Sequence, residues 1–163
     1  MEQAVINERS NRPVELVTFL LGGSLYGIDI LRVQEINKLR DWTSVPHSED
    51  FVLGILSLRG SIVTILDLAC KLGLPRTQRT ENTRNIVINS EGQECVGFLV
   101  DGIGSVTSTN WDQVCDPPPN VNGVQGRFLE GVLKTDEDLI AILNVDEVFS
   151  EGELKSQEGS VHP

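Results

Sequence analysis

Basic residues, aromatic residues and histidines are all scarce in this chain of 163 residues. Lys and Arg number 13 against 24 Asp and Glu, which gives a formal net charge of −11 at pH 7, and aromatic residues make up 5%. Proteins that bind nucleic acids or anionic membranes attract them mainly through Lys and Arg, and single-stranded nucleic acids also stack on aromatic rings. The composition therefore argues against direct binding to nucleic acid or to a lipid surface.

The chain also lacks the groupings that catalysis and metal binding require. Its two histidines are His47, in a Pro-His loop, and His162, next to the C-terminus. Cys70, Cys95 and Cys115 stand far apart, a pattern typical of reduced, buried thiols in a cytosolic protein. No Ser-His-Asp set and no Cys/His cluster with metal-ligand spacing can be assembled. The sequence predicts a protein that is not an enzyme and that binds neither cofactor nor metal.

Signal peptides and membrane spans are missing as well. The first residues lack the basic-then-apolar pattern of a signal peptide, and no apolar run approaches the ~20 residues that span a bilayer. Residues 1–14 and 151–163 are polar and aperiodic, and we expect both to be flexible tails, the second one acidic. A cytoplasmic protein is expected, which reaches a membrane only through a partner.

Short β-rich runs separated by turn residues fill the remaining sequence. Such spacing is typical of a barrel or a sandwich. The expected hairpins join runs 15–21 with 25–30, 85–89 with 94–100, and 128–134 with 139–143. Helical turns are expected only at 49–53, at 67–73 and at 144–149, the last with Asn144 as its N-cap.

Two β units, residues 15–80 and 85–145, are expected on either side of a polar bridge at 76–84. No helix is long enough for the crossover of a parallel α/β fold. A terminal strand of one unit could complete the other, and barrel closure would protect the edges of so many short strands.

Glu35 and Arg59 are charged residues inside otherwise apolar runs. If the two runs are adjacent in space, these residues form a partly shielded ion pair, which can fix geometry even where its net contribution to stability is small. Alternatively, each points to solvent from its own strand. Spacing alone favours the second interpretation.

Several motifs follow one another in order along the chain. They are Phe19-x-Leu21, Tyr26-Gly27-Ile28-Asp29-Ile30, Val33-Gln34-Glu35-Ile36, Leu58-Arg59-Gly60, Ile65-Leu66-Asp67-Leu68, Val96-Gly97-x-Leu99-Val100-Asp101 and Leu139-Ile140-x-Ile142-Leu143-Asn144. The ordered set resembles the CheW-type family of chemotaxis adaptors across about residues 15–150. Ser57, Thr64 and Asn144 depart from the Asn, Pro and Asp that are usual in the family.

The resemblance implies an all-β fold of two SH3-like five-stranded β-barrel subdomains that share a core, with few short helices. It also implies a non-catalytic adaptor that couples the cytoplasmic tips of methyl-accepting chemoreceptors to a CheA-type histidine kinase. The adaptor would dock barrel to barrel on the kinase's regulatory domain, and the receptor tip would lie in a groove between barrels. A chemosensory pathway without flagella stays open, as does a small β-barrel ligand-binding domain.

With this resemblance, the ion pair becomes the preferred interpretation of Glu35 and Arg59. It would hold the turn at Gly60 and present apolar side chains to a helical receptor tip. The residues expected to dock receptor or kinase are Val33, Glu35, Ile36, Ser57, Leu58, Arg59 and Gly60. Core packing remains the alternative for Val33 and Leu58.

Overall fold

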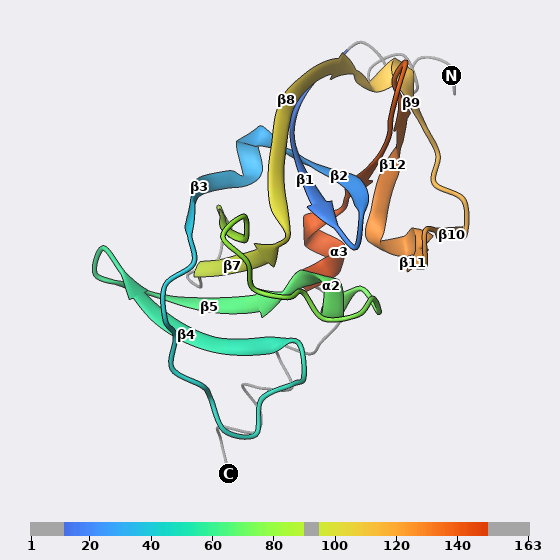
Figure 1. Ribbon diagram of the computed structural model, residues 1–163. Helices are drawn as coiled ribbons and strands as arrows, with labels where there is room; N and C mark the ends of the chain where they lie inside the picture. The colour runs from blue at the N-terminus through green and yellow to red at the C-terminus, as the bar shows by residue number, and fades with distance from the viewer. Residues whose placement is uncertain (1–11, 90–94, 150–163) are drawn as a thin grey trace.

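The computed structural model describes residues 12–89 and 95–149 as two curved β-sheets (Figure 1). The first sheet has six strands, in the spatial order β8 (Gly102–Asn110), β1 (Pro13–Leu21), β2 (Ser24–Asp29), β13 (Leu139–Leu143), β12 (Leu129–Lys134) and β9 (Val114–Cys115). The second sheet has five, in the order β3 (Val33–Lys38), β6 (Arg84–Ile88), β7 (Cys95–Val100), β5 (Ser61–Asp67) and β4 (Val52–Leu58). A separate two-stranded ribbon pairs β10 (Asn120–Val121) with β11 (Val124–Gln125).

Helix is confined to short segments in the described residues. They are α2 (Leu68–Lys71), α3 (Val145–Phe149) and the 3-10 turns η1 (Ile30–Arg32), η2 (Trp111–Gln113) and η3 (Gly126–Phe128). Asp67 caps α2 by accepting a hydrogen bond from the Cys70 amide at 3.2 Å, and Asn144 caps α3 by accepting one from the Glu147 amide at 3.1 Å. The predicted all-β class with few short helices is confirmed. The turn expected at 49–53 is shorter than predicted: the Val52 amide donates to the Glu49 carbonyl at 3.0 Å, and Val52 and Leu53 already belong to β4.

Two of the predicted hairpins are present in full. β1 and β2 are joined by Gly22 and Gly23, whose φ angles of +56° and +84° are those of the tight turn that fits the twist of paired strands. β12 and β13 pair around residues 135–138. The tip of the remaining hairpin, residues 90–92, lies outside the described residues, although its strands β6 and β7 pair antiparallel.

The sheets do not follow the division of the sequence into residues 15–80 and 85–145. β1 and β2 lie in the first sheet with strands from the second half of the chain, and β6 and β7 lie in the second sheet with β3, β4 and β5. In each sheet, a parallel pair joins strands from the two halves of the sequence: β2 pairs with β13, and β5 pairs with β7. The alternation of side chains does not specify the neighbouring strand, so the sequence allowed an exchange between the units but did not show which strands take part.

The boundaries of the expected tails need one correction. Pro13 and Val14 were expected in a tail, but they begin β1, where they pair with Asn110 and Thr109 of β8. Val14 is buried in an apolar cluster, which explains why the strand starts there. The other expected tail residues, 1–11 and 151–163, lie outside the described part of the chain.

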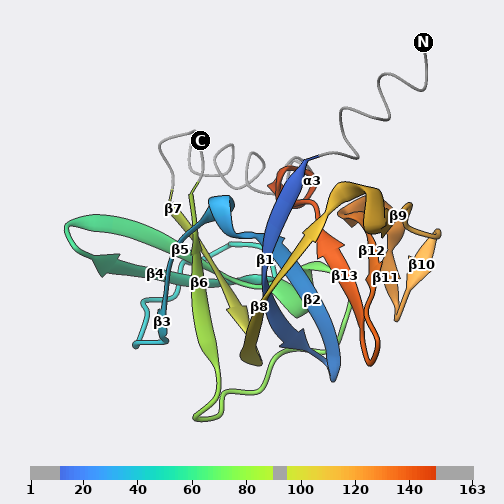
Figure 2. The same ribbon diagram turned by 90° about the horizontal axis from the view of Figure 1, so that it is seen from above.

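One hydrophobic cluster joins the two sheets. Phe19 and Tyr26 of the first sheet and Ile86 and Phe98 of the second belong to it, and all four are fully buried. Phe149 of α3 packs on Phe98 with ring centroids 5.9 Å apart. Each sheet also curls around a smaller cluster of its own, as expected for two barrels that share a core (Figure 2).

Replacing Tyr26 with Phe is expected to leave stability at neutral pH unchanged or to raise it. The Tyr26 hydroxyl is buried without a hydrogen-bond partner, and such a group costs roughly 1–3 kcal/mol. Burial raises the pKa of Tyr26 above the usual 10.0, so ionisation is disfavoured in the folded state. Below about pH 10 the neutral tyrosine makes its full contribution to the free energy of unfolding. That contribution is lost as the pH rises through the raised pKa of the folded state.

Urea unfolding of both proteins at pH 7 and above pH 10 would check this. The wild-type protein should lose more stability than the Tyr26→Phe variant on alkaline titration. A loss of more than about 1 kcal/mol for the variant at pH 7 would instead show that the hydroxyl makes a hydrogen bond, for example to a buried water.

Candidate functional site

The structure brings Glu35 and Arg59 together. Arg59 Nη1 lies 2.8 Å from Glu35 Oε1, and the other carboxylate oxygen accepts a hydrogen bond of 2.7 Å from Asn37 Nδ2. The Glu35 side chain is 17% exposed, whereas that of Arg59 is 80% exposed. Because the guanidinium is largely in water, the pair contributes at most about 1 kcal/mol to stability. The main effect of the ion pair is therefore to fix the position of Arg59 relative to Glu35.

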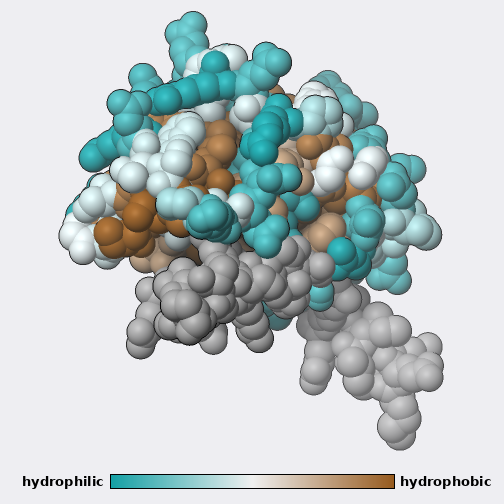
Figure 3. Space-filling view, turned by 90° about the horizontal axis from the view of Figure 1, so that it is seen from below, coloured by the Kyte–Doolittle hydropathy of each residue, from teal (hydrophilic) through white to brown (hydrophobic). Residues whose placement is uncertain are grey.

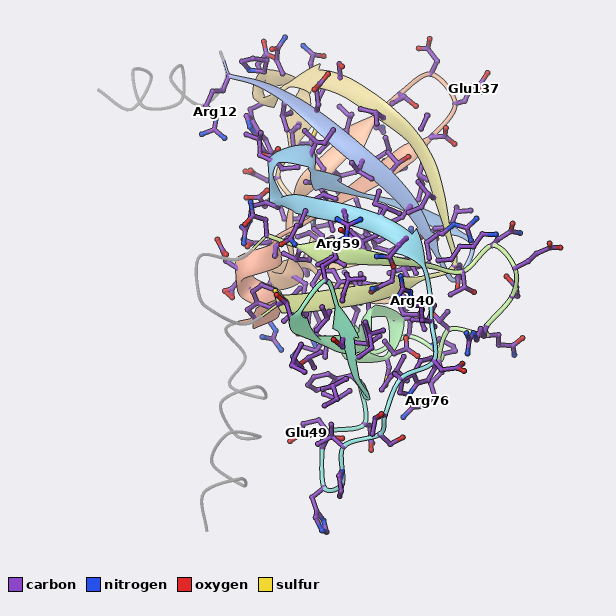
Figure 4. The ribbon with its side chains drawn as sticks, turned by 90° about the vertical axis from the view of Figure 1, so that its left-hand side faces the viewer. Arg12, Arg40, Glu49, Arg59, Arg76 and Glu137 are labelled. Carbon is purple, nitrogen blue, oxygen red and sulfur yellow. The ribbon has the colours of Figure 1, made fainter. Side chains whose placement is uncertain are left out.

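The ion pair connects opposite edges of the second sheet. Glu35 lies on β3, one outer strand, and Arg59 lies in the turn between β5 and β4, the other outer strand. Figure 4 shows Arg59 against β3. Arg59 and Gly60 have φ angles of +55° and +82°, an unfavourable conformation for an arginine, as is often found where geometry serves a function. The pair thus ties the hairpin turn to the far edge of the curled sheet.

The other predicted docking residues divide between surface and core. Ser57 and Gly60 are exposed, Ile36 is 38% exposed, and Val33 is half-buried against the shared core. Leu58 was expected on the docking surface, but it is 8% exposed and packs in the smaller cluster of the second sheet. Its side chain alternates with that of exposed Ser57, so the two point to opposite faces of β4.

Three large apolar side chains outside the predicted docking set are more than half exposed. They are Leu31 at 78%, Ile62 at 60% and Val106 at 53%. Ile62 pairs with Ser57 beside the Arg59 turn. The alternation of Ile62 with buried Val63 was a signal that could have revealed it. Figure 3 shows hydrophobic surface on the side of the molecule where the β4–β5 hairpin lies.

Two strands with unpaired edges belong to different sheets. β3, which carries Val33, Glu35 and Ile36, ends the second sheet, and β8, which carries Val106, ends the first. Figure 1 shows the two strands on the same side of the molecule. Each edge therefore carries an exposed apolar side chain.

Groups suited to chemistry are few in the described residues. Within 12–89 and 95–149, no group of three His, Cys, Asp or Glu side chains could hold a metal ion. None of the three cysteines is in a disulfide. Buried thiols were expected, but Cys70 and Cys95 are only half-buried and Cys115 is exposed. Burial raises the pKa of the Cys70 thiol, with Arg76 opposing and Asp67 and Asp50 adding to the shift. This thiol is accordingly less reactive than a free one.

Within residues 12–89 and 95–149, none of the helices combines the length and the apolar character that crossing a bilayer demands.

Comparison with known proteins identifies the family. The model of the CheW-like domain matches residues 15–153. The chain is 35% identical over 140 residues to the chemotaxis protein CheW of Klebsiella aerogenes, covering 86% of this chain and 84% of that protein. It is 30% identical over 144 residues to the probable chemotaxis protein CheW of Rhizobium etli, covering 87% and 91%.

A solved structure agrees with the sequence matches. The crystal structure of the scaffolding protein TtCheW from Thermoanaerobacter tengcongensis superposes with a TM-score of 0.78 at 31% identity, covering 86% of this chain and 90% of that one. The fold, the order of motifs and the sequence matches lead to one conclusion: this chain belongs to the CheW-like family of chemotaxis scaffold proteins.

Proposed function

We propose that this chain couples the cytoplasmic tips of methyl-accepting chemoreceptors to a CheA-type histidine kinase by docking both, without a catalytic step of its own. Membership of the CheW-like family supports the class of activity. The observation that carries the docking site is the Glu35–Arg59 ion pair, which holds an exposed hairpin turn against β3. The described residues, 12–89 and 95–149, would supply the docking surfaces, and receptors would recruit the protein to the inner face of the membrane.

The free edges of β3 and β8 form the surface that we assign to the receptor. A helical tip needs a preformed apolar surface with a few orienting polar groups. Val33 and Ile36 on one strand edge and Val106 on the other supply apolar contacts, and Glu35 supplies an orienting charge.

The exposed side of the β4–β5 hairpin is the surface that we assign to the kinase's regulatory domain. Ile62 and Ser57 lie side by side there, next to the turn that Arg59 fixes. Barrel-to-barrel docking would cover Ile62, whose burial would contribute about 1.5–3 kcal/mol. Because Arg59 touches β3 and also forms this turn, one ion pair would align both surfaces.

Co-sedimentation tests the proposal directly. Membranes that carry a chemoreceptor are mixed with the kinase, with and without this chain, and the pelleted kinase and its autophosphorylation rate are measured. Kinase should pellet and respond to a receptor ligand only when the chain is present. A folded chain that binds neither protein contradicts the proposal, whether the pathway drives flagella or another output.

A further inference from the structure

A lysine of α2 contacts aromatic rings that belong to the two different sheets. Lys71 Nζ lies 4.8 Å from the centroid of the Phe51 ring and 5.8 Å from that of Phe128. Phe51 immediately precedes β4 of the second sheet, and Phe128 immediately precedes β12 of the first. Phe51 and Phe128 are only 8% and 4% exposed, so the surrounding packing holds both rings in place. An ammonium group is attracted to the face of each ring, more strongly where water is excluded.

The lysine is attached firmly to the second sheet. α2 follows β5 without a connecting loop, and Figure 1 shows it at the end of that strand. The carboxylate of Asp67 accepts hydrogen bonds from the amides of Cys70 and Thr77, each at 3.2 Å. These bonds fix the start of the helix and the chain that follows it, and thereby the direction in which Lys71 extends.

Phe128 is attached just as firmly to the first sheet. Its carbonyl oxygen accepts a hydrogen bond of 2.8 Å from the Asn144 amide, between β13 and α3. The guanidinium carbon of Arg127 lies 4.3 Å from the centroid of its ring. A single ammonium group therefore connects a fixed point of one sheet with a fixed point of the other.

We propose that Lys71 is a positioning residue that sets the orientation of the two sheets relative to one another, and with it the separation of the free edges of β3 and β8. The second half of this inference rests on the proposed function, because these two edges form the surface assigned to the receptor. A second ion pair also links distant segments, Arg32 with Asp146 at 3.1 Å, but the Asp146 side chain is 80% exposed. Salt and water screen such a pair, whereas the Phe51 and Phe128 rings that Lys71 contacts are almost fully buried.

Residual dipolar couplings of backbone amides in the full chain test the orientation without any partner. The Lys71→Met variant keeps an unbranched apolar side chain but loses the charge, Lys71→Arg keeps the charge, and Lys134→Met removes an exposed charge of the first sheet. In the wild type, in Lys71→Arg and in Lys134→Met, one alignment tensor should fit both sheets. In Lys71→Met the two sheets should require different tensors. A Lys71→Met protein with the wild-type orientation overturns the proposal.

Binding to a soluble receptor signalling fragment tests the link to docking. The dissociation constant should rise about threefold to tenfold for Lys71→Met and return towards the wild-type value for Lys71→Arg. A changed orientation with unchanged receptor affinity overturns the link to the edges of β3 and β8. If the wild-type chain itself fails to bind the fragment, the proposed function is wrong, while the couplings still decide whether Lys71 orients the sheets.

Discussion

The Glu35→Lys variant is expected to lose receptor-dependent control of the kinase while it stays folded. The substitution places an ammonium group opposite the Arg59 guanidinium, where a contact of 2.8 Å now holds the β4–β5 turn. Repulsion should release that turn from β3 and move the proposed docking surface of Ile62 and Ser57 away from β3. We expect coupling to fall by at least about tenfold, the size of effect that loss of an interface anchor produces.

The measurement is kinase activity in receptor-containing membranes, with circular dichroism to verify the fold. Arg59→Ala should give the same loss, because it removes the same contact from the other side. Glu81→Lys is the matched control, since it makes the same charge change at an exposed position outside the proposed docking surfaces. A folded Glu35→Lys protein with full coupling would refute the site assignment.

A charge swap separates the geometry of the pair from direct contact with a partner. Glu35→Lys combined with Arg59→Glu restores opposite charges at the same two positions. Recovery of coupling relative to either single variant would show that holding the turn is what matters. If the double variant is as inactive as Glu35→Lys alone, these side chains must contact a partner directly, and the positional role is excluded.

Removal of the Asp67 carboxylate is expected to cause the largest loss of stability. Asp67 is 1% exposed, and its side chain accepts hydrogen bonds from the amides of Cys70 and Thr77. In Asp67→Ala, α2 loses its cap, which is worth about 1 kcal/mol, and a second shielded amide loses its partner at a cost of roughly 1–3 kcal/mol. We expect a total loss of about 3 kcal/mol in the free energy of unfolding.

Urea unfolding at pH 7 measures this loss. Asp67→Asn retains one oxygen that can cap the helix, and we expect it to lose about half as much. Asp101→Ala serves as the comparison, because Asp101 is only half-buried and accepts a single bond of 2.8 Å, from the Gly22 amide. If Asp67→Ala and the wild type unfold at the same urea concentration, burial of the Asp67 carboxylate costs as much free energy as its two hydrogen bonds contribute.

Much of the local structure could be predicted because it depends on near neighbours. Gly22 and Gly23 supply the positive φ angles of a tight hairpin, and Asp67 and Asn144 supply the caps of the two short helices. Each of these features is determined within a few residues of chain. The same reasoning ranked Glu35 and Arg59 as unusual, since a charge in an apolar run is visible without coordinates.

The proposed docking residues were harder to predict because burial depends on packing. Leu58 and Ile62 are both apolar residues of the same hairpin, yet Leu58 is 8% and Ile62 60% exposed. Alternation assigns them to opposite faces, but only the packed sheet shows which face is inside. Leu31 and Val106 were missed for the same reason.

The sequence by itself determined the class of this protein: short β strands, tight turns, capped helical turns and an ordered set of motifs that belongs to one family. Only the tertiary structure decided how β1 and β2 join strands from the far end of the chain, and how β3 meets the turn at Arg59. The physical reason is that backbone propensities act over a few residues, whereas strand pairing and burial depend on segments that are distant in sequence.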